Sequence, residues 1–499
     1  MSEAIPQNMA QARAPLATAG MATLGPLLLI FAATCSFYVV IAPLLVGHTD
    51  LGWHLAAGDL IRNEGRVPAH DPWSYTAGAM RWYNHTWLWD VIASLLFQHG
   101  GFTALILAAI FLGGVIAVSL GAICLAGNAT PIATCVAVIS ACILYPTYAI
   151  PDIFLAASPN IATLLFCVTF YGACLNRRHL WLAPASMILW ANMHGGFVLG
   201  LFILGVFLAG ALVRRDRSAF TAYAVALAAS FAATLVNPLG FETYAAVLLT
   251  VGHFVQRYIT EWQPFTHLMG SPQIIPACVY VVLFAVLEMR GGNTAPAEAR
   301  ILSWFFLVLG AWQLRYLSIF FLFSTLPVAL HLSRLRWGRL RWFRSNPPAD
   351  GKQLGAAGFL LLALLPLLYW NVVPAKPGLP QIYPDTELAY LEEHFPSARL
   401  LNHWNYGGFL ILRNRGAIPV FVDGRAATVY PDALLREYFT LISWEVDEAA
   451  WKHVLEKYDV DAVMWPKVHK QLAAFLVDKE GWTQVHSGSV ANLYVKRAH

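Results

Sequence analysis

The sequence predicts a polytopic α-helical membrane protein of about eleven spans, followed by a soluble C-terminal α/β domain. Of its 499 residues, 58% are hydrophobic and only 12% are charged, whereas a soluble domain is about one quarter charged. The mean hydropathy of +0.56 therefore argues against a disordered chain and against a purely soluble enzyme. After residue 373 the long apolar runs give way to short segments of alternating pattern, which predicts a separate soluble domain.

Eleven apolar runs define the expected spans. The first follows a cytoplasmic N-terminus, residues 1–23, and is too long for a signal peptide. The run over 88–125 is too long for one span, so we divide it at Gly100-Gly101 into an approach helix and a span. The expected membrane domain covers residues 24–373, with spans near 24–46, 101–125, 131–149, 159–175, 180–191, 196–213, 218–236, 273–289, 301–313, 316–332 and 354–372.

Basic residues predict the orientation of these spans, because lysine and arginine are enriched in cytoplasmic loops. An alternating count places the N-terminus and the basic clusters on the cytoplasmic side, and a large first outer loop, residues 47–86, outside. The net charge of +4 is then largely a topology signal and does not support nucleic-acid binding. The basic clusters are Arg177-Arg178, Arg214-Arg215-Arg217, Arg290 with Arg300, and the arginines between 334 and 344.

Two of the runs, 180–191 and 301–313, are short for a bilayer with about 30 Å of hydrocarbon. Each is followed by a polar turn on the outer side, one containing His194 and the other Arg315. Helix ends inside a membrane need protein or water around them, so we expect a cavity that dips into the outer leaflet. Alternatively, each pair of runs is one kinked helix, which would reduce the count to nine spans.

The tail, residues 374–499, alternates helix-like and strand-like segments. This alternation predicts a small three-layer domain with a partly parallel sheet. We expect helices over 385–394, 406–413, 432–442, 447–458 and 469–479, and strands over 399–403, 419–423, 460–465 and in two segments at the end.

The first outer loop carries the leading candidate for chemistry. Asp50 lies at the membrane boundary and His54 follows four residues later, so both can share one helix face. A carboxylate beside an imidazole suits general base catalysis or metal binding, although Asp50 could instead cap the following helix. The loop also holds His85 and several tryptophans, and acidic and aromatic residues together are typical of a sugar site.

Four further outer-side groups are candidates. Arg315 is a lone arginine between two apolar helices, which is costly without an anionic partner or a wet cavity. Its planar fork suits a phosphate, and the alternative is an arginine that snorkels to the interface. His194 either closes a helix end or contacts substrate. Glu261 and Asp152 are outer-loop carboxylates that could also belong to ordinary solvated loops.

In the tail, Trp404 and Tyr406 follow one predicted strand and Arg425 follows the next. Ligands bind at the carboxyl ends of parallel strands in α/β sheets, so these three are candidate substrate-binding residues. The neighbouring glycines also suit plain strand-to-helix turns. The sequence lacks the Walker A, GxGxxG, HExxH and GxSxG patterns, so nucleotide hydrolysis, nicotinamide chemistry and zinc proteolysis have no support.

This layout resembles the type-C (GT-C) membrane glycosyltransferases, which include oligosaccharyltransferases, protein O-mannosyltransferases and aminoarabinose transferases. That family has an acidic residue early in the first outer loop, which serves as catalytic base or metal ligand, and Asp50 matches it. The segment His403-Trp404-Asn405-Tyr406-Gly407 looks like the WWDYG acceptor-recognition motif of oligosaccharyltransferases, with histidine and asparagine in place of the first tryptophan and the aspartate.

The resemblance does not decide whether the protein uses a divalent metal ion. The DxD pattern of the oligosaccharyltransferases is missing, since Asp152 stands alone. Glu261 lies in a late outer loop, where that subfamily places a metal-binding acid. A divalent ion, Mg²⁺ or Mn²⁺, would have Asp50, Asp152 and Glu261 as candidate ligands. The short motifs around Asp50, His85 and His194 also look like bacterial membrane proteins assigned to the type-C transferases without a defined substrate.

The resemblance implies an inverting transfer of a hexose or pentose from a polyprenyl-phosphate-linked donor to a glycan, lipid or protein acceptor. The site would lie at the outer face of the bacterial inner membrane, with the C-terminal domain in the periplasm. Asp50 would act as base and Arg315 would hold the phosphate, while His54, His85 and His194 would orient the donor or the acceptor.

Two other classes of function compete with this hypothesis. A lipid or glycan transporter or flippase would pair charged residues near the membrane midplane and show symmetry between its halves. A non-catalytic scaffold with a periplasmic binding domain would leave Asp50, Arg315 and Glu261 far apart. The transferase hypothesis requires these three residues to line one cavity.

Overall fold

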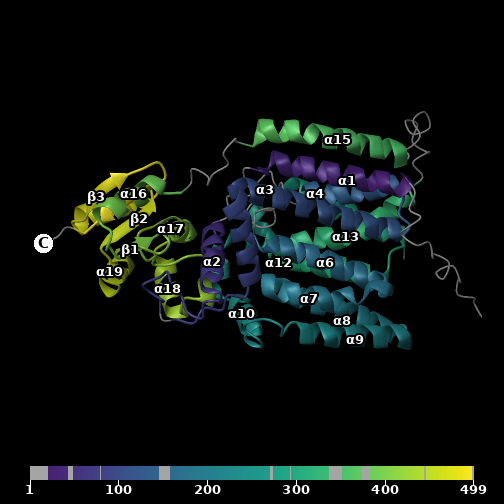
Figure 1. The fold of residues 1–499 in the computed structure, drawn as a ribbon, viewed down its shortest axis with the longest axis horizontal. Helices are drawn as coiled ribbons and strands as arrows, with labels where there is room; N and C mark the ends of the chain where they lie inside the picture. The colour runs from purple at the N-terminus through teal and green to yellow at the C-terminus, as the bar shows by residue number, and fades with distance from the viewer. Residues whose placement is uncertain are drawn as a thin grey trace, which may run out of the picture.

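The computed structural model shows a bundle of long helices with a mixed α/β domain at one end (Figure 1). It describes residues 21–42, 49–78, 80–144, 158–269, 274–292, 294–335, 351–373, 383–442 and 445–496. Residues 383–442 and 445–496 form the α/β part, here called the C-terminal domain. Between it and the bundle lie helix α2 (Leu51–Glu64) and helix α10 (Glu242–Thr250).

Each of the eleven apolar runs forms a helix in the described part of the chain. Six described segments are long and apolar enough to cross a membrane, and three shorter apolar helices accompany them, so the chain is an integral membrane protein, as predicted. The helices of the bundle are α1 (Met21–Val40), α3 (Trp87–Ala126), α4 (Pro131–Leu144), α6 (Asn160–Leu175), α7 (Leu182–Met193), α8 (Val198–Val213), α9 (Arg217–Ala233), α11 (Ile274–Gly291), α12 (Ala297–Trp312), α13 (Leu317–Ser333) and α15 (Gly351–Val372).

Helix α3 is broken where the sequence predicts a break. Gly100 has φ −148° and ψ 15°, and Gly101 has φ 57° and ψ −149°, the second of which is a conformation that favours glycine. The approach segment that starts at Trp87 packs beside α2, where Gly58 lies so close to the backbone of Asp90 that a Cβ atom would overlap it. The break therefore lets one apolar run both support the first loop and enter the bundle.

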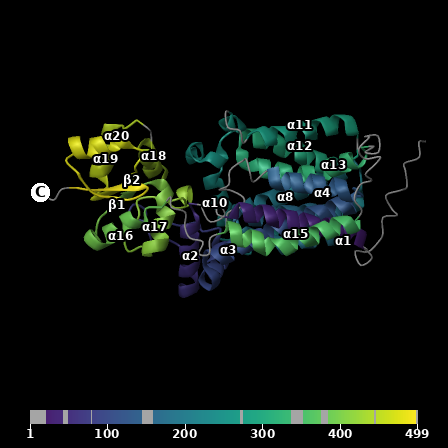
Figure 2. The ribbon, with the colours of Figure 1, turned by 90° about the horizontal axis from the view of Figure 1, so that it is seen from above.

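In the described part of the chain, polar contacts at the helix ends show that α7 and α8 are two separate helices, as are α12 and α13, and that neither pair is one kinked helix. The turns before α7 and before α9 meet, since Nη1 of Arg177 lies 4.0 Å from Oδ2 of Asp216. Likewise, Nδ1 of His331 near the end of α13 lies 2.8 Å from Oγ1 of Thr294, just before α12. In both cases a pair of helices starts and finishes at the same end of the bundle, so each pair is an antiparallel hairpin (Figures 1 and 2).

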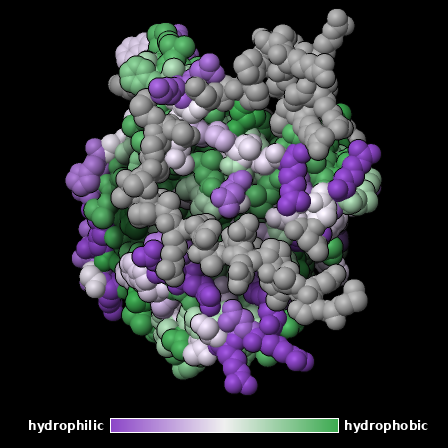
Figure 3. All heavy atoms as spheres, turned by 90° about the vertical axis from the view of Figure 1, so that its right-hand side faces the viewer, coloured by the Kyte–Doolittle hydropathy of each residue, from purple (hydrophilic) through white to green (hydrophobic). Residues whose placement is uncertain are grey.

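Hydrophilic side chains gather on the end of the bundle opposite the C-terminal domain (Figure 3). The short 3-10 turn η4 (Arg177–His179) and the turn between α8 and α9 expose Arg178 and Arg215 there. A buried cluster also lies at this end, in which Glu288 pairs with Arg300 at 2.6 Å and with His331 at 2.7 Å. This separation of basic turns from the C-terminal domain accords with the expected topology, which stays a prediction.

The C-terminal domain contains a four-stranded mixed sheet in the order β1-β2-β4-β3. Strands β1 and β2 are parallel, with Leu401 opposite Val463, and the other two pairs are antiparallel. The elements are α16 (Asp385–His394), β1 (Leu400–Asn402), η11 (Trp404–Tyr406), α17 (Gly407–Asn414), η12 (Ala426–Thr428), α18 (Asp432–Thr440), α19 (Glu448–Lys457), β2 (Ala462–Pro466), α20 (Lys470–Ala474), a π-helical turn η13 (Phe475–Lys479), β3 (Thr483–Ser487) and β4 (Ala491–Val495).

One predicted strand, 419–423, is absent from this sheet. Its only described β pairing is a parallel bridge between Val420 and Ser74 of the first loop. The amide of Val420 donates to the carbonyl of Trp73 at 2.9 Å, and its carbonyl accepts from the amide of Tyr75 at 3.3 Å. The segment has strand-like composition, but the first loop is its partner.

Two apolar cores hold the molecule together, and the first loop contributes to both, with Leu51 and Leu55 in the core of the bundle. The bundle helices share one core. Trp53, Trp73 and Trp82 of the first loop are buried in the other, together with the apolar side chains of the C-terminal domain. Burial of a large aromatic side chain contributes about 1.5–3 kcal/mol, so the loop is firmly attached to this domain.

Candidate functional site

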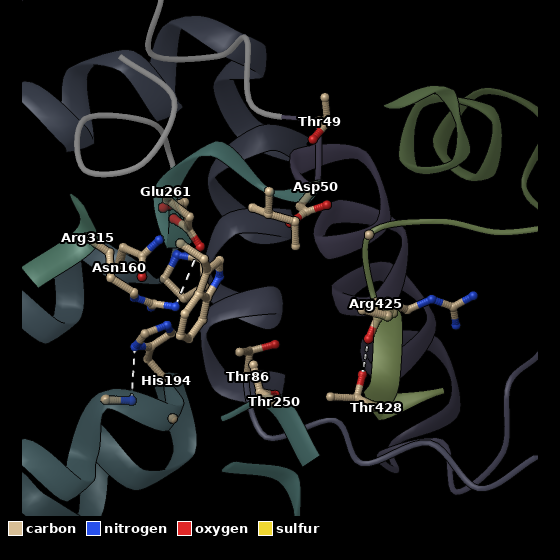
Figure 4. A pocket seen from close by; sticks show the side chains of 18 of the residues that line it. Thr49, Asp50, Thr86, Asn160, His194, Thr250, Glu261, Arg315, Arg425 and Thr428 are labelled. Carbon is tan, nitrogen blue, oxygen red and sulfur yellow. Dashed lines mark hydrogen bonds and ion pairs between the residues drawn. The ribbon is translucent and has the colours of Figure 1, made fainter. Parts of the chain in front are cut away.

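A cavity of about 550 Å³ lies where the bundle, the first loop and the C-terminal domain meet. This volume is within the range of about 300–1,000 Å³ that is typical of ligand sites. Its walls come from the start of α2, the start of α6, the turn between α7 and α8, residues of the segment 247–262, the turn before α13 and two loops of the C-terminal domain (Figure 4).

The structure brings most of the predicted site residues to this cavity, although their roles stay predictions. Tyr406 is buried and does not line it, and Asp152 lies outside the described residues. Asp50, Arg315 and Glu261 share one cavity, as the transferase hypothesis requires and the scaffold hypothesis does not. The predicted residues that line it are Asp50, His54, His85, His194, Glu261, Arg315, Trp404 and Arg425.

Arg315 lies in the turn η9 (Leu314–Tyr316), between α12 and α13. Its Nη1 atom is 3.6 Å from Oε1 of Glu261, in the turn η7 (Thr260–Trp262). Its guanidinium also lies over the ring of Trp262, 3.9 Å from the ring centre. A guanidinium has five N–H donors, and among the described residues Glu261 is its one ion-pair partner, so donors remain for an anionic ligand. Arg315 is thus held at the cavity and does not snorkel.

His194 is fixed as a neutral ring with its proton on Nε2. Its Nδ1 atom accepts a hydrogen bond from the amide of Gly196 at 3.1 Å and therefore carries no proton itself. The hydroxyl of Thr163, 2.6 Å from the same atom, then acts as a donor to it. Trp190 donates in turn to that hydroxyl at 3.1 Å. The remaining Nε2–H of His194 is a donor in the cavity wall, on the same side as Arg315 (Figure 4).

His54 is oriented by a buried carboxylate that our sequence analysis missed. Its Nδ1 atom is 2.6 Å from Oδ1 of Asp90, whose side chain is fully buried. Asn84 donates to the other oxygen of Asp90 at 2.9 Å, and the hydroxyl of Thr86 lies 3.2 Å from Oδ1. An aspartate inside an apolar run is costly to bury, and that cost was the available signal. This carboxylate sets the ring orientation of His54.

His85 and His403 contribute neutral imidazoles. Nδ1 of His85 lies 3.3 Å from the carbonyl of Tyr83 and donates to it, which leaves Nε2 as an acceptor. Burial lowers the pKa of His85. Burial, and then the charge of His469, lower the pKa of His403 to about 3. Neither of these two rings is therefore a cation beside Arg315.

Asp50 precedes α2 but does not cap it. It occupies the N-cap position with φ −84° and ψ −15°, and its side chain makes no capping hydrogen bond. The carboxylate instead lies against Gly424 of the C-terminal domain, where a Cβ atom would overlap it. The helix-cap interpretation of Asp50 is therefore wrong, and its carboxylate belongs to the cavity wall (Figure 4).

Arg425 requires a correction. Its backbone lines the cavity, but its guanidinium points away from it (Figure 4) and its side chain has no exposed surface. Nη1 lies 2.6 Å from Oδ1 of Asp71 and Nη2 lies 2.6 Å from Oδ2 of Asp423. The prediction that this side chain binds substrate is wrong, because its guanidinium is already paired with two buried carboxylates.

Trp404 contributes an aromatic wall on the side of the C-terminal domain. It lies in η11, beside Phe439, with the ring centres 5.1 Å apart. The preceding His403 accepts a hydrogen bond from the amide of Asn405 through Nδ1 at 3.3 Å. His403, Trp404 and Asn405 all line the cavity. The predicted strand-to-helix turn is therefore present, and it also faces the site.

The described residues do not by themselves make a metal centre. No group of three or more histidine, cysteine, aspartate or glutamate side chains among them is arranged to hold a metal ion. Glu261 is paired with Arg315, and a third candidate ligand, Asp152, is not among the described residues. We therefore derive no chemical step from Mg²⁺ or Mn²⁺, which stay predictions.

Comparison with known proteins places the fold. No protein-family profile matches the sequence, and no curated protein matches it. The archaeal oligosaccharyltransferase AglB from Archaeoglobus fulgidus, in complex with an inhibitory peptide and a dolichol-phosphate, has a TM-score of 0.56 at 13% identity, covering 94% of this chain and 74% of that chain.

Two further structures of the Archaeoglobus fulgidus oligosaccharyltransferase agree. The enzyme tethered to an acceptor peptide with the NVT sequon has a TM-score of 0.57 at 14% identity, with coverage of 94% and 74%. The complex with Zn and sulfate has a TM-score of 0.50 at 14% identity, with coverage of 94% and 73%. The chain therefore has the fold of these oligosaccharyltransferase structures, and the resemblance that the sequence predicted is confirmed at the level of the fold.

Proposed function

We propose that this protein is a membrane glycosyltransferase that moves a sugar from a polyprenyl-phosphate-linked donor to an acceptor at the outer face of the bacterial inner membrane. The observation that carries the proposal is the convergence of Asp50, Arg315 and Glu261 on one cavity between the bundle and the C-terminal domain. The fold adds support, because a structure with the same architecture binds a dolichol-phosphate.

The donor phosphate would bind at Arg315. The guanidinium supplies a permanent charge and paired donors, which suit a phosphate. The Nε2–H of His194 adds a neutral donor on the same side of the cavity. When the bond from the anomeric carbon to the phosphate oxygen breaks, the electron pair stays on the phosphate. Donors already in place stabilise that charge without reorganisation.

The acceptor hydroxyl would bind beside Asp50. In an inverting transfer its oxygen attacks the anomeric carbon on the face opposite the phosphate. Asp50 would accept the hydroxyl proton as the new carbon–oxygen bond forms. His54, held by Asp90, and His85 would orient the hydroxyls of the donor or acceptor, and Trp404 would offer an apolar ring face to a sugar.

The orientation belongs to the same proposal. The N-terminus, residues 1–23, and the basic turns would face the cytoplasm, and the C-terminal domain, residues 374–499, would lie in the periplasm. The cavity would then open at the outer leaflet, where a lipid donor reaches it from the membrane.

Binding of polyprenyl phosphate tests the donor site. We expect Arg315→Ala to weaken binding of polyprenyl phosphate in detergent by about 10- to 100-fold, since hydrogen bonds to charged groups contribute about 1.5–3 kcal/mol. The matched control is Arg81→Ala, because Arg81 also pairs with one glutamate, Glu242, but is half exposed and does not line the cavity. Equal binding by wild type and Arg315→Ala would contradict the proposed donor site.

A further inference from the structure

The loop that ends in Arg425 is fixed on both sides of Gly424. The side chain of Asp423 accepts hydrogen bonds from the amide of Arg425 at 2.9 Å and from its Nε at 2.8 Å. The second oxygen of Asp423 accepts from Nη2 of Arg425 and from the hydroxyl of Tyr430, each at 2.6 Å. The residues before and after Gly424 therefore have no freedom to turn.

The first loop completes this network. Asp71 binds Nη1 of Arg425 through Oδ1, and the same carboxylate accepts from the amides of Trp73 and Ser74, each at 3.1 Å. The rings of Trp73 and Trp82 lie 5.0 and 4.9 Å from the guanidinium carbon, which adds cation–π attraction. The carboxylates of Asp71 and Asp423 hold the pKa of Arg425 above its ordinary value, against the effect of burial. The Asp71–Arg425–Asp423 network thus joins the first loop to the C-terminal domain.

Glycines bring the backbones into direct contact around Asp50. A Cβ atom on Gly52 would overlap the carbonyl of Gly408, and one on Gly408 would overlap the carbonyl of Thr49. A Cβ atom on Gly424 would overlap the carboxylate of Asp50. The start of α2, the start of α17 and the loop at Gly424 are therefore packed without space between them, and Asp50 lies in the middle of this contact.

We propose that the Asp71–Arg425–Asp423 network positions the base of the reaction: it holds Gly424 against Asp50 and so fixes the carboxylate in the orientation that accepts the acceptor proton. This inference rests on the proposed function. Arg425 touches neither donor nor acceptor and acts only through Gly424, so it is a positioning residue. The C-terminal domain is then a structural part of the active site as well as a cover for it.

The steric contact can be tested without any activity. The backbone of Gly424 has no positive φ, and the three atoms nearest to an added Cβ atom all belong to Asp50, so the overlap with Asp50 is the main cost of alanine there. We expect Gly424→Ala to lower the thermal unfolding temperature of the full-length protein in lipid nanodiscs by a few degrees. In the Asp50→Ala background the same substitution should have almost no effect, because the overlapping group is gone. Equal effects in both backgrounds would overturn the inference.

The kinetic test separates positioning from general structural damage. With the donor that the wild type uses, Gly424→Ala and Arg425→Lys should each lower kcat by about 10- to 100-fold, because displacement of a reacting group by about 1 Å has a cost of this order. The KM for the donor should change less than twofold, since Arg315 is unaffected. Wild-type kcat in Gly424→Ala, or an equal loss in kcat and in donor binding, would overturn the inference.

Matched controls use positions outside the site. Gly205→Ala places a methyl group on α8, where nothing lies within 4 Å, and Arg413→Lys changes an exposed ion pair with Asp385 in the same domain. Both should keep wild-type kcat. If the wild type itself releases no polyprenyl phosphate from any donor, the proposed function fails, while the unfolding cycle still decides whether Gly424 and Asp50 are coupled.

Discussion

At the scale of single residues, the cavity combines the charged guanidinium of Arg315 with the neutral imidazoles of His85, His194 and His403. Arg315 is permanently charged, whereas His194 has an acceptor role at Nδ1 that requires its neutral form. The network around Arg425 shows the opposite use of the same side-chain type. There the guanidinium is enclosed by two carboxylates and holds two parts of the fold together.

The lowered pKa of His403 predicts a loss of stability in acid. Its folded pKa, about 3, lies below the ordinary value of about 6.5, so the unfolded chain binds more protons between these two values. The contribution of the neutral His403 ring to the free energy of unfolding is therefore complete above about pH 6.5, and it is lost as the pH falls toward 3. We expect the unfolding temperature to fall between pH 7.5 and pH 5, and the fall to be smaller in His403→Asn.

Asparagine is the suitable replacement because it can still cap η11 in place of Nδ1. The control is His70→Gln, an exposed histidine of the first loop, which should show the same fall as the wild type. An equal fall in His403→Asn and wild type would show that His403 is not a source of the acid sensitivity.

From the sequence, a residue could be placed at the cavity where a single position carries an unusual cost, and its role stays a prediction. Arg315 and Asp50 are scarce charges at apolar boundaries, and both line the cavity. Prediction from the sequence failed for Arg425, because the decisive partner, Asp71, lies 354 positions away in the chain and no local pattern connects them. It also missed Asp90, although an aspartate inside an apolar run is a local signal, because its role depends on a contact with the distant His54.

At the scale of elements, the hydropathy pattern was sufficient to predict the helices of the bundle, but it predicted only some of the strands of the sheet. Apolar runs located the helices because a membrane segment must satisfy its own backbone hydrogen bonds. Whether α7 and α8 are two helices or one kinked helix could be decided only from contacts between turns, such as that of Arg177 with Asp216. The segment 419–423 was assigned to the sheet because strand composition does not name the partner, which is Ser74 of the first loop.

The break in α3 gives a prediction at this scale. Gly101 has φ 57° and ψ −149°, a conformation that costs other residues about 1–3 kcal/mol. We expect Gly101→Ala to lower the unfolding temperature by a few degrees, whereas Gly205→Ala in α8 should not. The two substitutions add the same methyl group, so a matching effect would mean that the break does not depend on glycine.

At the scale of the whole molecule, the basic turns and the C-terminal domain lie at opposite ends of the bundle (Figures 1 and 3). Cytoplasmic loops are rich in lysine and arginine, so the proposed function requires the C-terminal domain to be periplasmic. We expect a membrane-impermeant maleimide to label Lys452→Cys on intact spheroplasts, and Arg178→Cys only after permeabilisation. Both positions are exposed. The unmodified protein is the control for its own cysteines, and the reversed pattern would contradict the topology.

The central claim is that Asp50 is the base of a sugar transfer from a polyprenyl-phosphate donor. Its most direct test is the rate of polyprenyl phosphate release by Asp50→Asn in proteoliposomes supplied with polyprenyl-phosphate-linked mannose, glucose and arabinose. The control is Asp59→Asn, a half-exposed carboxylate on α2 that pairs with Arg62 at 3.7 Å. Loss of a general base costs about 10²–10⁴ in rate, so we predict this loss for Asp50→Asn, with bound polyprenyl phosphate unchanged and Asp59→Asn fully active. Turnover of Asp50→Asn at the wild-type rate would contradict the claim.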